Sequence, residues 1–549
     1  MSVMSVISVL LSLLGLAPIG PSDPAVAKKP LAPVLGGLGT WSLPVTTSSP
    51  RAQQFFDQGL RLSYGFNHAE AIRAFQEAGR LDRSMAMAAW GEAFALGPNI
   101  NAPLTEESQK QAYEAIQRAK TLGAKATEKE RALIDALALR YSTDTKAERA
   151  PFDRAYADAM RTVAARFPDD ADVNALYAAA VMDTMPWSYW NKDGSPKDRT
   201  NEVIETLERV MAKHPAHAGA HHFYIHMVEA GPAPERGVRS ADVLADLMPG
   251  AGHMVHMPSH IYLRVGRYAD ASAANERAIV ADEDYLTQCQ AQGMYPIGYY
   301  PHNVHFLWFA SSFEGRSAQA IDNARKTAEK VPHHVSAHVG SLHDLPVVPL
   351  YAYVRFGKWA DVLTTPKPAD SNDYGIAVWH YARALAFTAR QQLDRARAEA
   401  AALDEVAARE VFKTTLKDSP LAGNLGIATR VVRGEIAAAE KDYAKAVAVL
   451  TEAVKLNDEQ SYMEPAYWHF PVRHNLGAVL LEAGRPAVAE QVFREDLKRN
   501  RENGWALFGL MQSLERQDDP RKKDELSTVA TRFRKAWARA DVTLTAARF

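Results

Sequence analysis

A two-helix pattern that recurs along the chain constrains the fold more than any other feature of the sequence. Its clearest copy spans residues 55–83, with Gly59 in the first helix and Ala71, Phe75 and Ala78 in the second. Small residues at such points let two helices approach closely, while the larger side chain fills the gap between neighbouring pairs. Stacked pairs of this kind bury a continuous core, so the pattern predicts a helical solenoid.

The same spacing returns further along the chain, in copies marked by Gly266, Gly315, Gly434, Gly477 and Gly509. The unit resembles the tetratricopeptide repeat, a pair of antiparallel helices with a small residue in helix A and Ala-x3-Phe-x2-Ala in helix B. The resemblance implies an all-α fold, a right-handed superhelix of about twelve helix pairs. No segment alternates apolar and polar residues at period two, so strands are not expected.

Composition shifts divide the chain into segments. We expect an extended linker over 28–50, N-terminal repeats over 51–213, central His-rich repeats over 214–356, and C-terminal repeats with a capping helix over 357–549. A formal net charge of −2 gives no basic face for phosphate, so nucleic acid is excluded as a general partner. The single cysteine, Cys289, excludes an internal disulfide framework and Cys-based zinc modules.

The first residues resemble a secretory signal peptide. An apolar run over 3–16 is followed by Pro18, Gly20 and Pro21, and then by a small-x-small site at 25–27. No Lys or Arg precedes the run, so a disordered or anchoring N-terminus is the alternative. We expect residues 1–27 to be removed and the protein to be exported, periplasmic or secreted. The run is too short for a stable membrane span, and none recurs later.

Histidine is the most informative residue type. Fourteen of the 18 His residues fall between His214 and His343, where an even spread would give about four. Their spacing places them on helix faces: His222, His226 and Glu229 at i, i+4 and i+7; His253, His256 and His260 at i, i+3 and i+7; His302 and His305 at i and i+3.

The resemblance to tetratricopeptide repeats gives these faces a direction. It puts the eight residues at helix-A positions that line the concave groove, in three consecutive repeats that should be neighbours. Neutral imidazole is the commonest metal ligand, and a carboxylate completes the set. The sequence therefore predicts a transition-metal centre with one or two ions and these ligands: His222, His226, Glu229, His253, His256, His260, His302 and His305.

Within this set, His256 and His260 are the leading ligands, because they lie on the central helix of the three. Nitrogen and oxygen ligands without thiolate fit zinc, copper, iron or nickel. The pattern is not HExxH, so no metalloprotease motif supports it. Six other histidines, among them His214, His217 and His221, fall at boundaries or off the groove register, where capping or packing is expected.

Two functions remain open at this stage. In the first, the chain is a metal-dependent enzyme, a hydrolase or oxidoreductase acting on a small or peptide-like substrate, with Glu229 as ligand or general base. In the second, it is a scaffold that binds a peptide or partner protein in the groove without catalysis. Two aromatic insertions, 185–196 and 284–301, predict a cover over the site from Trp187, Trp190, Tyr299 and Tyr300, or plugs at the solenoid edge.

Overall fold

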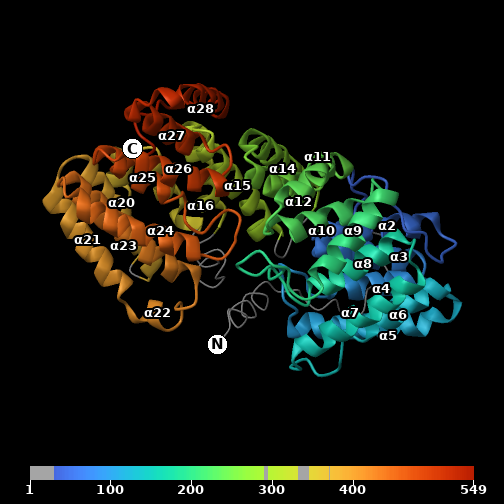
Figure 1. Cartoon of the computed structure of the whole chain (residues 1–549). Helices are drawn as coiled ribbons and strands as arrows, with labels where there is room; N and C mark the ends of the chain where they lie inside the picture. The colour runs from blue at the N-terminus through green and yellow to red at the C-terminus, as the bar shows by residue number, and fades with distance from the viewer. Residues whose placement is uncertain (1–29, 290–294, 332–344, 370) are drawn as a thin grey trace. The chain divides into compact units, whose positions relative to one another are not determined.

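The computed structural model describes residues 30–289, 295–331, 345–369 and 371–549, and these ranges are mostly helical (Figure 1). They contain no β-strand, and extended pairing within them is limited to two isolated bridges, Asn99 with Ala102 and Trp190 with Pro196. The predicted all-α fold is confirmed. The predicted export signal, residues 1–27, lies outside the described ranges and stays a prediction.

The chain forms two compact units. The N-terminal unit consists of residues 30–261 and Glu276–Tyr300; the C-terminal unit consists of Tyr262–Asn275 and Pro301–Phe549. The segment predicted as the central His-rich repeats is therefore divided between two units, and each unit is described by itself below.

In the N-terminal part of the chain, the helices follow one another with short connections. Their bounds are α2 (Pro50–Tyr64), α3 (His68–Leu81), α4 (Ala86–Leu96), α5 (Glu106–Leu122), α6 (Glu128–Ala138), α7 (Arg149–Arg166), α8 (Ala171–Met182), α9 (Thr200–Lys213), α10 (Ala218–Glu229), α11 (Val238–Leu247), α12 (Gly252–His256), α13 (Pro258–Val265) and α14 (Tyr268–Gln288). Local signals fix several starts. Thr127 and Glu130 form a reciprocal capping box at α6, and Ser49 caps α2 just before Pro50.

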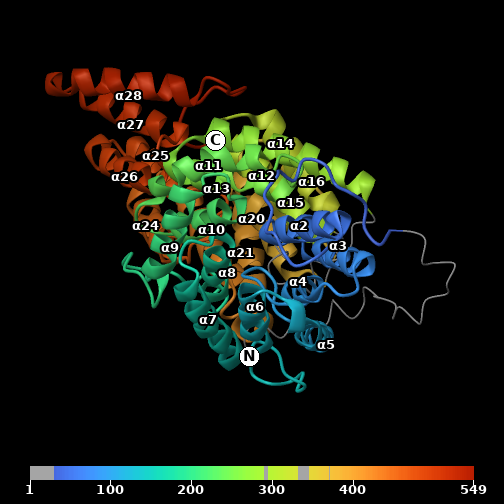
Figure 2. The same cartoon turned by 90° about the vertical axis from the view of Figure 1, so that its right-hand side faces the viewer.

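The C-terminal part continues the series (Figure 2). Its helices are α15 (Tyr300–Phe313), α16 (Ser317–Lys330), α18 (Val348–Arg355), α19 (Trp359–Thr364), α20 (Asp373–Ala389), α21 (Leu393–Ala407), α22 (Glu410–Lys413), α23 (Pro420–Ala439), α24 (Tyr443–Glu459), α25 (Arg473–Glu482), α26 (Pro486–Arg499), α27 (Gly504–Gln517) and α28 (Lys523–Ala536). Within the described ranges, no helix combines the length and the apolar character needed to cross a bilayer.

The contacts of the recurring small residues explain how the pairs stack. The Phe75 ring of α3 is fully buried between Gly59 of α2 and Gly91 of α4; a Cβ on either glycine would lie 2.8 or 2.4 Å from the ring. Phe493 of α26 occupies the same place between Gly477 and Gly509. Each Phe therefore joins its own pair to the next, which is the packing that the tetratricopeptide pattern predicted.

The turn between the two helices of a pair needs a left-handed backbone residue. Glycine supplies it at Gly266, Gly315, Gly357 and Gly484, with φ between 62° and 79°. This conformation carries no steric penalty for glycine, whereas a bulky side chain is strained there. In the first pair the residue at this turn is Phe66, with φ 57°. An aromatic residue at this position needs a separate reason, which the site below provides.

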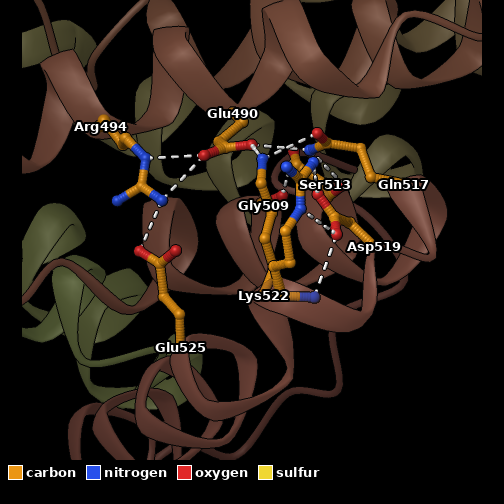
Figure 3. A network of polar contacts seen from close by, with 9 residues as sticks. Glu490, Arg494, Gly509, Ser513, Gln517, Asp519, Lys522 and Glu525 are labelled. Carbon is orange, nitrogen blue, oxygen red and sulfur yellow. Dashed lines mark hydrogen bonds and ion pairs between the residues drawn. The ribbon is translucent and has the colours of Figure 1, made fainter.

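A buried carboxylate ties the last helices of the C-terminal unit together (Figure 3). Glu490 of α26 accepts hydrogen bonds from Arg494 (2.8 Å), Gln517 of α27 (2.7 Å) and Lys522 (2.6 Å). Arg494 also contacts Glu525 of α28 at 2.5 Å. Burial raises the pKa of Glu490, but these hydrogen bonds outweigh burial and lower the pKa to about 2. The network holds α28 against the repeats that precede it.

We predict that Gly59→Ala destabilises the N-terminal unit, because the Phe75 ring is held from both sides and cannot move away from the new methyl group. The expected loss is about 1–3 kcal/mol in the free energy of unfolding. Gly79→Ala is the matched control. It lies in α3 with only ordinary contact to Ala88 at 3.5 Å, and should stabilise by about 0.5–1 kcal/mol. Urea unfolding followed by circular dichroism measures both; equal shifts would contradict the packing.

A second prediction concerns pH. Glu490→Gln should lower the stability of the C-terminal unit at pH 7 by about 1–2 kcal/mol, since it removes a charged acceptor. The folded-state pKa is depressed, so the contribution is complete above the ordinary value of 4.5 and is lost as pH falls towards 2. The difference in melting temperature between wild type and variant should therefore be smaller at pH 3 than at pH 7. A gap of constant size would show that the charge of Glu490 is not what stabilises the network.

Candidate metal centre

Helix α10 carries three of the predicted residues on one buried face. His222, His226 and Glu229 are 0%, 2% and 0% exposed. The helix begins where His217 accepts the backbone N–H of Ala220 through Nδ1 (3.0 Å). This histidine is thus a helix cap, as its position at a boundary predicted.

A second set of histidines comes from two short helices rather than from one. Pro258 has no N–H to donate, so α12 ends at His256 and α13 begins at Pro258. His253 and His256 lie on α12, and His260 lies on α13. All three are buried, at 2%, 0% and 2% exposed. The sequence spacing treated them as one face of a continuous helix, which the proline interrupts.

Three imidazoles converge on one point inside the N-terminal unit. The Nε2 atom of His222 lies 3.1 Å from Nε2 of His226 and 3.2 Å from Nε2 of His253. One ligand atom from each of the three residues lies within 4.8 Å of the other two. Ligands held at 2.0–2.1 Å in a tetrahedron are about 3.3–3.4 Å apart. The two separations from His222 are therefore close to those of ligands around one transition-metal ion.

The contacts of Nδ1 in His222 and His226 determine which ring nitrogen carries the proton. Nδ1 of His222 contacts the Tyr64 carbonyl oxygen at 2.6 Å, and Nδ1 of His226 contacts the Glu229 carboxylate at 2.7 Å. Both oxygens can only accept, so both Nδ1 atoms donate a proton. The neutral forms of His222 and His226 then direct Nε2 lone pairs at each other. Burial lowers the pKa of both histidines, which favours these neutral forms.

Glu229 holds two histidines at once. Its Oε1 accepts from His226, and its Oε2 accepts from Nδ1 of His260 at 2.5 Å. Burial raises the pKa of Glu229, but His260 and His226 outweigh burial and hold the pKa well below its ordinary value. His260 in turn directs Nε2 at Nε2 of His256, 2.9 Å away. The carboxylate thus orients ring nitrogens in both groups of histidines.

Phe66 explains the strained turn of the first repeat. Its ring centroid lies 4.6 Å from that of His222, 5.9 Å from His226 and 5.6 Å from His253. The side chain is 7% exposed. Non-glycine residues with positive φ cluster at functional sites, where surrounding contacts hold the strain. The ring fills one side of the three-histidine cluster, and glycine at this turn would leave that space empty.

One residue of each aromatic insertion lies against the cluster as predicted, whereas Trp190 donates to the Met227 carbonyl (2.8 Å) and Tyr300 donates to Glu283 (2.9 Å). Trp187 lies edge-on to His226 with ring centroids 5.2 Å apart, and Tyr299 lies 4.7 Å from His253. Asn101 links the two, because its Oδ1 accepts from Trp187 Nε1 (3.1 Å) and its Nδ2 donates to the Tyr299 hydroxyl (3.2 Å). Trp187 is 39% exposed, so it faces solvent as well as the site.

The last two predicted ligands, His302 and His305, lie in the C-terminal unit. His302 packs edge-on to Phe306 at 4.9 Å, and His305 stacks on Trp308 at 5.0 Å. Burial lowers the pKa of His305 to about 3. The convergence of all eight residues would involve both units and stays a prediction. Inside the N-terminal unit, six of the eight lie in two linked groups.

Sequence reasoning missed three participants. Phe66 reads as an ordinary turn residue, although an aromatic side chain is a usable signal where four other pairs carry glycine and two carry the polar residues Gln391 and Lys441. Asn101 reads as turn chemistry, and its link between two insertions depends on distant residues. The carbonyl of Tyr64 has no sequence signature at all.

Comparison with known proteins adds little to this description. No family model matches the sequence, and no curated protein is similar to it. Among solved structures, the chain is similar to the Cut9–Hcn1 hetero-tetramer of the APC/C (13% identity; 84% of this chain and 76% of that chain covered; TM-score 0.32). It is also similar to the human IFIT1 dimer with m7Gppp-AAAA (12% identity; 79% of this chain and 87% of that chain covered; TM-score 0.34). A third similar structure is yeast Tom70 (10% identity; 88% of this chain and 93% of that chain covered; TM-score 0.27). These TM-scores are too low for an argument about function.

We predict that Glu229→Gln weakens the N-terminal unit even without metal. The amide has one acceptor oxygen where two Nδ1–H groups require two, so one buried donor loses its partner. The expected loss is about 1.5–3 kcal/mol in the free energy of unfolding, measured in the presence of a chelator. Glu205→Gln on the exposed face of α9 is the control and should be neutral. Equal stability of the two variants would contradict the role assigned to Glu229.

Proposed function

We propose that this chain is a metal-binding helical-repeat protein that holds one transition-metal ion between Nε2 of His222, His226 and His253. The observation that carries the proposal is the approach of these atoms to 3.1 and 3.2 Å while the Nδ1 protons of His222 and His226 are engaged elsewhere. Lone pairs that face each other at this distance repel. A bound cation turns that repulsion into coordination.

The hydrogen bonds made by the opposite ring nitrogens support the same proposal. Metal-binding histidines almost always donate their other ring N–H to a carboxylate or a backbone carbonyl, which fixes the tautomer. His222 and His226 do so to Tyr64 and Glu229. Because both oxygens of Glu229 accept from imidazoles, we assign this residue a positioning role. The scaffold alternative fits these side chains less well, since a peptide in the groove could not reach residues that are 0–2% exposed.

Three nitrogen ligands leave one position open on a tetrahedral ion. That arrangement is typical of catalytic zinc sites, where the ion activates water or polarises a carbonyl oxygen. It supports a metal-dependent hydrolase or oxidoreductase as the activity. Trp187, which contacts both His226 and solvent, lies where a substrate or water would approach. The all-nitrogen set is compatible with zinc, copper or iron.

The test is metal binding by paired variants of neighbouring residues. Protein made without a histidine tag, stripped with a chelator and titrated with zinc, copper(II) or iron(II), should bind one equivalent of at least one of these ions per chain. His222→Gln keeps a donor for the Tyr64 carbonyl but loses the ligand, so its affinity should fall at least 100-fold, about 2.7 kcal/mol or more.

His221→Gln is the matched control. His221 is the next residue and is buried, yet its ring contacts Ser240 and the Pro215 carbonyl outside the cluster. This variant should bind as wild type does. Bound metal should also raise the melting temperature by mass action, so chelation should lower it for wild type and His221→Gln only. Metal binding that survives in His222→Gln, or its absence from the wild type, would leave the peptide-groove function as the better account.

A further inference from the structure

The C-terminal unit contains a pocket of about 380 Å³ that the metal centre does not use. It lies among α18, α20, α23 and α25 and the last residues of the chain. Its charged residues are Arg355, Glu435, Glu482 and Arg548, its polar lining includes Asn475, and its apolar lining includes Leu385 and Phe470. Pockets of ~300–1,000 Å³ with a few convergent polar groups are typical of small-molecule sites.

Arg355 is a buried cation that contacts no anion among the residues that the structure describes. It is 4% exposed, stacks on Trp505 with 3.6 Å from its central guanidinium carbon to the ring centroid, and contacts Nδ1 of His474 through Nη1 (3.1 Å). Asp496 is reached only through His474, at 3.1 Å from Nε2 of that ring. In the described part of the chain, Nη2 has no hydrogen-bond partner. Burying such a charge is costly unless an anion pairs with it.

Asn475 also lines this pocket and carries an acceptor without a partner among the described residues. Its Nδ2 contacts Oε1 of Glu435 at 2.7 Å, and a carboxylate oxygen can only accept there, so the amide orientation is fixed. The side chain is 3% exposed, and its Oδ1 has no partner among the described residues. This buried oxygen lacks a hydrogen-bond donor, just as Nη2 of Arg355 lacks an acceptor among the described residues.

The remaining charges of the lining already pair with one another. Arg548 lies 2.8 Å from Glu435 and 3.0 Å from Glu482. With Arg355, the lining holds two charges of each sign. A ligand without net charge leaves this balance unchanged, and it satisfies both unmet groups if it carries an anion at one end and a donor at the other.

We propose that this pocket binds a small zwitterionic organic acid with the chemistry of a free α-amino acid. Its carboxylate accepts from Nη2 of Arg355, its ammonium donates to Oδ1 of Asn475, and its side chain lies against Leu385 and Phe470. The proposal is independent of the metal centre, because every residue of the pocket belongs to the C-terminal unit.

The experiment is a thermal-shift screen of the full chain against the twenty common L-amino acids at millimolar concentration, followed by calorimetry on those that stabilise. Each is paired with the amine that lacks its carboxylate. At least one amino acid should raise the melting temperature of the transition that reports the C-terminal unit. Its decarboxylated partner should not. Absence of any amino-acid effect, or an equal effect of the amine, would overturn the proposal.

Variants locate the site. Arg355→Met should bind the selected amino acid at least tenfold more weakly, while its own stability is retained, since apolar side chains of similar size often replace buried ions without loss. Arg397→Met, at an exposed position of α21 with 51% side-chain exposure, is the control. Ala439→Phe, which narrows the pocket and leaves Arg355 in place, should also weaken binding. Wild-type affinity in either pocket variant would overturn the assignment.

Discussion

The buried carboxylate of Glu229 is the interaction on which the candidate metal centre depends. It accepts from His226 of its own helix and from His260 of a helix that follows the proline break, so it joins α10 to α13 inside the protein. By accepting a hydrogen bond from each Nδ1–H, it turns the opposite nitrogen of each ring inward. The Tyr64 carbonyl does the same for His222. These contacts direct Nε2 of His222 and of His226 at each other, 3.1 Å apart, and Nε2 of His253 lies 3.2 Å from that of His222. The proposed cation would bind between these three nitrogens.

The repeat scaffold makes such a site possible. Phe75 and Phe493 each lie between glycines of two successive helices, which fixes the spacing of helix pairs without using polar groups. Polar residues are therefore not needed for this stacking and can gather elsewhere in each unit. In the N-terminal unit the imidazoles lie against Phe66. In the C-terminal unit Arg355 lines a pocket. One packing rule thus supports two different groups of buried polar residues, one in each unit.

Local periodicity explains what could be predicted from the sequence. Glycine and phenylalanine at fixed spacing gave the helix pairs, and the i, i+4, i+7 register placed His222, His226 and Glu229 on one face of α10. What could not be predicted depends on long-range contacts. Asn101 bridges Trp187 and Tyr299 from a distant loop. Pro258 divides a helix that the histidine register treats as continuous. The unpaired edge of Arg355 becomes visible only when its neighbours are placed, because no local pattern separates a buried arginine from an exposed one.

X-ray absorption spectroscopy of the metal-loaded protein tests the central claim most directly, because it reports the atoms bound to the ion and their distances. Our account predicts a first shell with about three imidazole nitrogens at ~2.0–2.1 Å and one further oxygen or nitrogen ligand, with no sulfur. The multiple-scattering features of imidazole should weaken when His253 is replaced. A first shell made of oxygen alone, or an unchanged spectrum in the His253 variant, would contradict the convergence of the three histidines on one ion.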